Sequence, residues 1–312
     1  MCAEVSSIEK TFFAMGTANS VTIYEEDLTG ALEECCDRTL RLHGLMSVFD
    51  PSSEVSRINS SAGNAPVSVS DDVFDLIKRC VGYSEKTGGK FDITAGPSAA
   101  LWKSAIKRGS LPLSEEIKNA ATLTGHRDIT FDNKHGKIGL KRKGQKIDLG
   151  GIAKGFAADE ARRILLEHGI ENELINYGGT VIVAGETRKV GIRDPFSKDR
   201  VFASVEVADR AVVTSGYYEQ FLRLGNRIYH HIIDPTTGEP PEPVFAGITL
   251  IGESAEELDA YATALFCMTA EDAFQFVNGN GVDAVFVTAD RNIIITDGIK
   301  DDFSLLQDGG TL

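Results

Sequence analysis

The amino-acid sequence predicts an α+β fold, in which short strands and amphipathic helices alternate along the chain. Runs that alternate apolar and polar residues, typical of half-buried strands, are interspersed with stretches whose apolar residues recur at helical spacing. The sequence has no repeat of fixed period and no low-complexity linker. We therefore expect two lobes that share the central segment rather than two separable domains.

The first half of the chain is expected to contain a hairpin, two long helices and a short meander. Residues 10–24 predict two strands joined at Met15-Gly16-Thr17, and residues 46–59 predict a polar loop. Apolar residues at helical spacing predict helices over 29–45 and 72–87, and Ser114 is expected to cap a shorter helix. The strands of the meander are expected at 129–131, 137–140 and 145–149.

The second half is expected to be richer in strands. Helices are predicted over 156–166 and over 253–268, the latter entered through Ser254. The predicted strands are two runs in 174–185 broken at Gly178-Gly179, then 190–195, 203–207, 211–215, a short apolar strand within 229–240, 247–251, and a closing hairpin of 282–288 and 292–296.

The stretch 146–155, which reads K-I-D-L-G-G-I-A-K-G, joins a predicted strand to a predicted helix. Glycine at such a junction lets the backbone approach a ligand closely, and the free N–H groups of a helix start favour a phosphate. Asp148 before the turn and Lys154 after it add one charge of each sign. A glycine-closed turn with a surface lysine would have the same residues, so the motif by itself leaves both interpretations open.

Composition excludes several classes of function. Hydrophobic residues make up 42% of the chain and charged residues 25%, which is ordinary for a globular protein. The net charge of −14 argues against a nucleic-acid surface, but it leaves room for a local positive site and for a divalent cation. No apolar run reaches the length of about 18 residues that a transmembrane helix needs. The five cysteines have no metal-ligand spacing and predict reduced thiols.

Asp259 and Thr263 are four positions apart in the predicted helix over 253–268 and therefore share a face. A hard cation prefers a carboxylate with a hydroxyl or carbonyl oxygen, and Mg²⁺ usually keeps waters and substrate phosphates as its other ligands. The alternative is that the Thr263 hydroxyl bonds back to its own helix while Asp259 faces solvent. The residues alone leave both possibilities open.

Two further places combine residue types that suit a binding site. His230 and His231 are adjacent on a predicted strand, so only one of them can face a given cleft, where it could do acid–base work. Met15 and the segment 90–92 each place an apolar or aromatic side chain beside a small or acidic residue. Such pairs can sandwich a flat ring and bind its polar edge, although strand ends and turns often have the same composition.

Taken together and in this order, nine segments between about residues 12 and 269 resemble the FAD:protein FMN transferase family, also called ApbE. They read F-F-A-M-G-T, M-S-V-F-D-P-S-S-E-V-S-R-I-N, G-G-K-F-D-I-T-A-G-P, I-D-L-G-G-I-A-K-G-F-A-A-D, N-Y-G-G, V-G-I-R-D-P, V-V-T-S-G, Y-H-H-I-I-D-P-T-T-G and D-A-Y-A-T-A-L. The resemblance implies an α+β fold with a tunnelling-fold-like portion and mixed sheets flanked by helices. It also implies one domain of two interleaved lobes over 10–300, with tails at 1–9 and 301–312.

The resemblance implies a Mg²⁺-dependent enzyme that cleaves FAD, attaches FMN through a phosphoester bond to a threonine or serine of an acceptor protein, and releases AMP. The implied acceptor is a subunit of a membrane redox pump or a flavin-dependent reductase. Two other activities remain open: a Mg²⁺-dependent pyrophosphatase that produces free FMN and AMP, and a flavin-binding protein without turnover.

Residues that match the family's segments receive their implied roles from the resemblance. Asp259 and Thr263 would hold Mg²⁺ together with the main-chain oxygen of Gly151, and His231 would take the proton from the acceptor hydroxyl. Contacts to FAD are implied for Met15, Phe49, Lys90, Phe91, Asp92, Asp148, Lys154 and Ile233. The chain as written shows no signal peptide, so we expect a cytoplasmic protein; the alternative is an exported lipoprotein anchored at Cys2 after removal of its signal.

Overall fold

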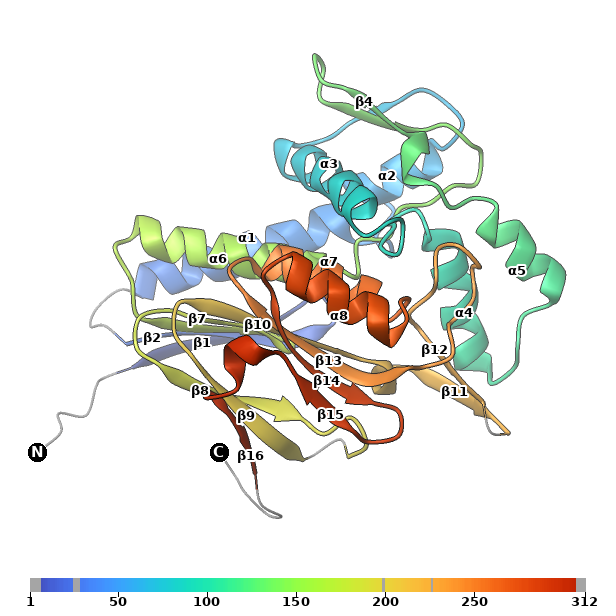
Figure 1. Cartoon of the computed structure of the whole chain (residues 1–312). Helices are drawn as coiled ribbons and strands as arrows, with labels where there is room; N and C mark the ends of the chain where they lie inside the picture. The colour runs from blue at the N-terminus through green and yellow to red at the C-terminus, as the bar shows by residue number, and fades with distance from the viewer. Residues whose placement is uncertain (1–6, 25–28, 198–199, 226, 307–312) are drawn as a thin grey trace, which may run out of the picture.

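The computed structural model describes residues 7–24, 29–197, 200–225 and 227–306 (Figure 1), so Cys2 lies outside the described residues. The α+β class is confirmed. The helices are α1 (Thr29–Met46), α2 (Glu54–Ser60), α3 (Asp71–Lys86), α4 (Gly96–Arg108), α5 (Ser114–Ala121), α6 (Ala153–Glu167), α7 (Ala255–Leu265) and α8 (Ala270–Gly279). In the described part of the chain, none of them is long and apolar enough to cross a membrane.

An eight-stranded sheet forms the centre of the molecule, with strand order β1-β2-β6-β7-β10-β13-β14-β15. Its strands are β1 (Ile8–Ala14), β2 (Thr17–Ile23), β6 (Glu173–Tyr177), β7 (Thr180–Val183), β10 (Arg210–Gly216), β13 (Phe245–Gly252), β14 (Asp283–Thr288) and β15 (Ile293–Ile295). The named pairs of this sheet are all antiparallel. The expectation of mixed sheets is therefore wrong for this sheet, in which hairpins join three of the neighbouring pairs, β1–β2, β6–β7 and β14–β15.

Three smaller sheets accompany the large one, and their named pairs are also antiparallel. They are β16-β9-β8, β3-β5-β4 and the hairpin β11-β12, formed by β3 (Val67–Ser68), β4 (Ile129–Asp132), β5 (Lys137–Leu140), β8 (Arg188–Arg193), β9 (Val201–Val207), β11 (Phe221–Leu224), β12 (Arg227–His230) and β16 (Phe303–Leu305). Because β16 pairs with β9, the segment 301–312 that was expected to be a tail contributes a strand.

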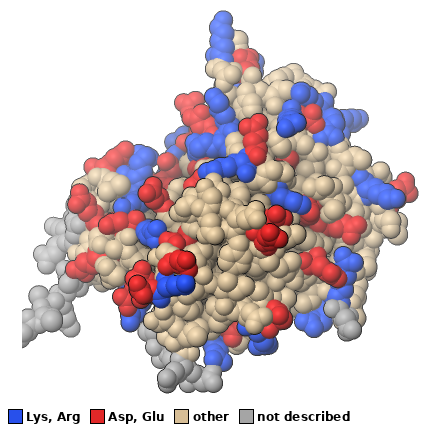
Figure 2. All heavy atoms as spheres, viewed as in Figure 1, with Lys and Arg blue, Asp and Glu red and all other residues tan. Residues whose placement is uncertain are grey.

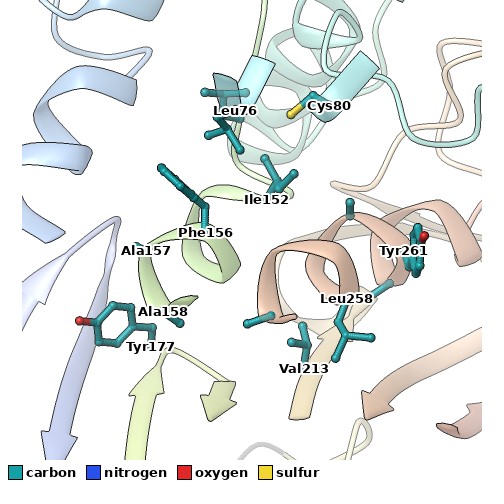
Figure 3. Packing of buried hydrophobic residues seen from close by; sticks show 14 of the residues in the cluster. Leu76, Cys80, Ile152, Phe156, Ala157, Ala158, Tyr177, Val213, Leu258 and Tyr261 are labelled. Atoms are coloured by element: carbon teal, nitrogen blue, oxygen red, sulfur yellow. The ribbon is translucent and has the colours of Figure 1, made fainter. Parts of the chain in front are cut away.

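The large sheet is covered on both faces. Helices α1, α6 and α7 lie over one face, and the β16-β9-β8 sheet packs on the other (Figure 1). Strand β13 is therefore buried along all 8 of its residues, as expected of a strand with a packed layer on each side. Figure 3 shows the helical side of the core, where Leu76 and Cys80 of α3 lie over Ile152 and Phe156.

Several predicted elements differ from the observed ones. The segment 145–149 is extended but forms only a single bridge, between Lys146 and Ala95, because the Asn59 side chain takes both the N–H and the carbonyl of Ile147. Ser114 is the first residue of α5 and does not cap it; the cap residue is Leu113, whose N–H donates to the Glu116 carboxylate.

Helix α4 had clear signals that the prediction did not use. Its first turn contains Pro97, and it ends at Gly109 with a positive φ of 74°, which is the usual arrangement of proline and glycine around a helix. Helix α2, capped by Ser53, likewise occupies part of the predicted polar loop over 46–59. The strand predicted within 229–240 ends early, at His230.

Candidate active site

One large cleft collects the residues to which the sequence assigned a chemical role. Its volume is about 1790 Å³, well above the roughly 300–1,000 Å³ of ordinary small-molecule sites. All twelve predicted site residues line it: Met15, Phe49, Lys90, Phe91, Asp92, Asp148, Gly151, Lys154, His231, Ile233, Asp259 and Thr263. They come from the β1–β2 turn, four loops, the start of α6 and the inner face of α7.

The start of α6 and the middle of α7 meet at the acid that was predicted to bind metal. Asp259 is only 2% exposed, which rules out the alternative in which it faces solvent. Its Oδ2 accepts a hydrogen bond from the Gly155 N–H at 3.1 Å, and the Lys154 Nζ lies 3.5 Å away. The N–H groups at this helix start are therefore not all free for a phosphate, because Gly155 donates to Asp259 and Ala153 to the Leu149 carbonyl.

Gly155 allows this close approach. A Cβ at position 155 would overlap the Ala255 carbonyl oxygen and the backbone of Glu256. At the same contact Asp159 of α6 caps α7, since its carboxylate accepts hydrogen bonds from the Ser254 hydroxyl and from the N–H groups of Ala255 and Glu256. Burial raises the pKa of Asp159, and these hydrogen bonds oppose that shift. The two helices are thus held in a fixed register, which places Asp259 beside Lys154.

Thr263 brings a hydroxyl to the same place, and the main chain of Gly151 lies beside it. A Cβ built on Gly151 would lie 2.9 Å from the Thr263 Oγ1, so the main chain of Gly151 runs directly over that hydroxyl. The Thr263 hydroxyl donates to the carbonyl of Asp259 at 3.1 Å, as the sequence alternative allowed. This bond leaves the lone pairs of Oγ1 available to a cation.

The donor set fits a hard divalent ion. It consists of a buried carboxylate, a hydroxyl and a nearby main-chain segment, which are the oxygen ligands that Mg²⁺ accepts. Both hydrogen bonds to the Asp259 carboxylate end at Oδ2, and no described residue donates one to Oδ1. Within the described ranges there is no cluster of three or more His, Cys, Asp or Glu side chains that could hold a metal, so a cation here would need ligands from water or substrate.

The two histidines separate as the strand pattern predicts. His230 is fully buried between the rings of Tyr217 and Phe266, at centroid distances of 6.1 and 6.4 Å, and burial lowers its pKa to about 4. His231 follows the end of β12 and lines the cleft. Its Nδ1 lies 3.3 Å from the Gln220 carbonyl; when Nδ1–H donates there, Nε2 is the basic nitrogen of the neutral ring.

Met15 sits at the cleft in a sharp turn. The two residues between β1 and β2, Met15 and Gly16, have φ values of 53° and 78°, as type I′ hairpin turns require. The Met15 N–H donates to the Nδ1 of His43 at 3.1 Å, which fixes the turn against α1. Phe49 also lines the cleft and is 85% exposed, so its large apolar ring faces solvent.

The predicted 90–92 segment contributes less than its pattern suggested. Phe91 is 3% exposed and belongs to the core. The Asp92 carboxylate is taken up by internal hydrogen bonds from Thr94 and His126. Lys90 forms an ion pair of 2.9 Å with Asp234, an acid that was not among the predicted site residues.

Lys103 is the clearest residue that sequence reasoning missed. Its Nζ forms an ion pair with the Asp148 Oδ2 at 3.0 Å, and both side chains line the cleft. The other oxygen of Asp148 accepts the Gly150 N–H and so shapes the glycine turn. Lys103 belongs to α4, and without that helix in the prediction nothing directed its side chain to the cleft.

Comparisons with known proteins agree with one another. The model of the ApbE family matches residues 15–286. A Treponema pallidum protein named FAD:protein FMN transferase is 31% identical over 96% of this chain and 89% of its own length. A Klebsiella pneumoniae protein of the same name is 32% identical over 86% of this chain and 85% of its own.

Solved structures show the same likeness. The crystal structure of an ApbE protein from Thermotoga maritima has a TM-score of 0.86 and 32% identity, covering 95% of this chain and 99% of that one. The flavin transferase ApbE from Vibrio cholerae has a TM-score of 0.84 and 25% identity with the same coverage.

Proposed function

Since this chain belongs to the ApbE family, we propose that it is a Mg²⁺-dependent FAD:protein FMN transferase. In this reaction an acceptor hydroxyl of a threonine or serine attacks the FMN phosphorus of FAD. A phosphoester bond forms, the bond to the AMP oxygen breaks, and AMP leaves with the electron pair. The acceptor is a protein such as a redox-pump subunit or a flavin-dependent reductase.

One observation carries the proposal: Asp259, Thr263, Lys154 and His231 all open onto the same large cleft. A cavity of about 1790 Å³ has room for a dinucleotide and for the side chain of an incoming acceptor. Phosphoryl transfer requires little covalent help from a protein; it requires alignment of the nucleophile and neutralisation of charge. These four side chains supply the two charges, the hydroxyl and the base that such a reaction uses.

Asp259, Thr263 and the main-chain oxygen of Gly151 would hold Mg²⁺, which when bound supplies positive charge to the diphosphate. Lys154, whose ammonium lies 3.5 Å from the Asp259 carboxylate, adds a second positive charge at the same wall of the cleft. His231 accepts the proton of the acceptor hydroxyl at Nε2 as that oxygen attacks. The Gln220 carbonyl keeps the proton of the neutral ring on Nδ1 and so orients the base.

Other cleft residues would bind the flavin nucleotide. Met15 and the exposed ring of Phe49 offer apolar surfaces for a flat ring system, and the buried Phe91 lines the same cleft. Lys90, Asp148 and the main chain at Ile233 would make the polar contacts, whereas the Asp92 carboxylate is already engaged by Thr94 and His126. The ion pairs Lys90–Asp234 and Lys103–Asp148 hold two of these polar side chains in place.

Incubation with FAD, Mg²⁺ and an acceptor domain that contains a flavinylation threonine tests the proposal. We expect the intact mass of the acceptor to rise by one FMN and AMP to appear in equal amount. A threonine-to-valine acceptor serves as the control and should gain nothing. Free FMN without acceptor modification would instead indicate a pyrophosphatase, and tight FAD binding without either product would indicate a flavin-binding protein.

A further inference from the structure

A second cavity lies beside the candidate active site and has a different character. It has a volume of about 670 Å³, and its lining includes Arg223, Arg227, Arg291, Tyr217, Phe196 and Glu242; we call it the arginine groove. Three guanidinium groups converge here on a chain whose net charge is −14. Figure 2 shows basic side chains beside the end of the β11–β12 hairpin, at lower right.

The three arginines of the groove are exposed and are not used by the fold as ion-pair partners. Among the described residues, no carboxylate lies within 4.0 Å of their guanidinium nitrogens, whereas other arginines of the fold do form ion pairs, such as Arg210–Asp283.

Aromatic rings hold two of the three arginines instead. The Arg291 guanidinium lies 4.2 Å from the centre of the Phe196 ring, and that of Arg227 lies 4.7 Å from the centre of the Tyr229 ring. Stacking uses the flat face of a guanidinium and leaves its in-plane N–H donors for a carboxylate. Burial raises the pKa of Tyr217, and the positive charges of Arg223 and Arg291 oppose that shift, so both charges act on the same wall of the groove.

Arg291 has a left-handed backbone conformation, which is common for the residue that ends a turn in a short hairpin loop. Its φ is +73°, in the left-handed region that favours glycine or asparagine, yet the residue is an arginine in the short connection between β14 and β15. Such a conformation costs on the order of 1–3 kcal/mol, and strained residues of this kind concentrate at functional positions. The neighbouring Asp290 forms no ion pair with Arg291 among the described residues, and its carboxylate accepts hydrogen bonds from Thr288 and Asn292.

The groove and the candidate active site share one hairpin. Strand β12 begins at Arg227, ends at His230 and is followed by His231, which lines the large cleft. At about 3.3 Å per residue, the four steps from Arg227 to His231 span roughly 13 Å. Tyr217 lines the groove, whereas its neighbours Gly216 and Tyr218 line the cleft.

From this arrangement we propose that the arginine groove docks an acidic segment of the acceptor protein and so delivers the acceptor hydroxyl to His231. The proposal rests on the proposed function, because it assumes a protein acceptor. Carboxylates about four residues from the hydroxyl, in an extended segment, would reach the groove while the hydroxyl enters the cleft. Glu242 at the same groove disfavours a partner that is acidic along its whole length, and this favours a short acidic cluster.

Peptide binding tests the docking without requiring the transfer reaction. The probes are two fluorescent synthetic peptides with the same threonine, one flanked by a run of aspartates and the other by asparagines. We expect the aspartate peptide to bind about tenfold or more tightly in fluorescence anisotropy, with an advantage that shrinks as salt is added. The double variant Arg223→Ala/Arg291→Gly should lose that advantage, while it keeps its fold because glycine accepts the φ of position 291.

The matched control is Arg41→Ala, which removes an exposed arginine of α1 that lines neither cavity and should retain the preference. Equal affinity for the two peptides, an unchanged preference in the double variant, or displacement of the peptide by millimolar inorganic phosphate would each overturn the docking proposal. If FMN transfer to an acceptor domain proceeds equally in the double variant, the docking proposal fails and the proposed function stands. If the aspartate preference is present but no acceptor is ever flavinylated, the groove binds acidic segments and the proposed function fails.

Discussion

The N–H of Gly155 donates a hydrogen bond to the carboxylate of Asp259 at 3.1 Å, although the two residues are 104 positions apart in the chain. This bond joins the first turn of α6 to the middle of α7. It places a buried acid next to the glycine turn that precedes α6. Substitutions that separate the two helices should therefore affect the candidate active site as well as the stability of the fold.

Gly155→Ala tests this contact. The added methyl group overlaps the Ala255 carbonyl, so we expect a loss of roughly 1–3 kcal/mol in the free energy of unfolding, as overpacked cores usually show. The measurement is denaturant unfolding. Gly44→Ala is the matched control, because Gly44 lies within α1 with no atom within 4 Å of a Cβ at that position. That change should stabilise the protein by about 0.5–1 kcal/mol, and equal effects of the two substitutions would contradict the packing argument.

Met15→Asn separates the backbone of the β1–β2 turn from its side chain. Asparagine tolerates the φ of 53° better than methionine does, so we expect a gain of about 0.5–1 kcal/mol in the free energy of unfolding. FAD affinity, followed by flavin fluorescence, should fall severalfold because the apolar surface is lost. Asp209→Asn, at another left-handed position outside the cleft, should leave FAD affinity unchanged. Unchanged affinity in Met15→Asn would remove Met15 from the flavin site.

His230 should make stability depend on pH. Its pKa in the folded protein is about 4, lowered chiefly by burial, whereas an unfolded histidine titrates near 6.5. The unfolded state therefore binds more protons between these values, and the free energy of unfolding should fall as the pH drops from about 6.5 towards 4, by on the order of 3 kcal/mol. Urea unfolding at pH 7.5 and pH 5 measures this, and His230→Gln should flatten the difference. The same slope in His230→Gln and in the exposed control His135→Gln would contradict the assignment.

His231→Ala tests the proposed base. Loss of a general base usually lowers a rate by about 10²–10⁴-fold, and we expect such a loss in the flavinylation of an acceptor domain, followed by intact mass. FAD binding, followed by flavin fluorescence, should change little. His135→Ala, which alters an exposed histidine on the β4–β5 turn, is the control and should flavinylate normally. Retained flavinylation in His231→Ala would show that another group takes the proton.

Local patterns were sufficient for most elements of the fold. The helical spacing of α1, α3 and α7, the Ser254 cap and the glycine break between β6 and β7 all lie where the sequence predicted them. Predictions failed where a distant residue decides the local structure. Residues 145–149 look like a strand, but the Asn59 side chain occupies the backbone groups of Ile147, and no property of the segment itself reveals that contact.

In the candidate site, too, local patterns predicted some residues, and contacts between distant residues were missed. Residue type and spacing selected Asp259, Thr263 and Lys154, and all three line the cleft. The glycine motif suggested a close approach of the backbone to a ligand. Gly155 instead lets α6 pack closely against α7, 100 residues further along the chain. Partners such as Lys103 and Asp234 were invisible to a linear pattern, since each is defined by an ion pair to a residue far away in the sequence.

The most direct test of the account is the position of a divalent ion in a crystal grown with FAD and Mn²⁺, located by its anomalous scattering. The account predicts a single peak at the cleft wall, within coordination distance of the Asp259 carboxylate, the Thr263 hydroxyl and the Gly151 carbonyl oxygen, with the diphosphate of FAD as a further ligand. The peak should be absent from Asp259→Asn crystals. A metal ion bound elsewhere, with Asp259 and Thr263 directed away from both ion and diphosphate, would contradict it.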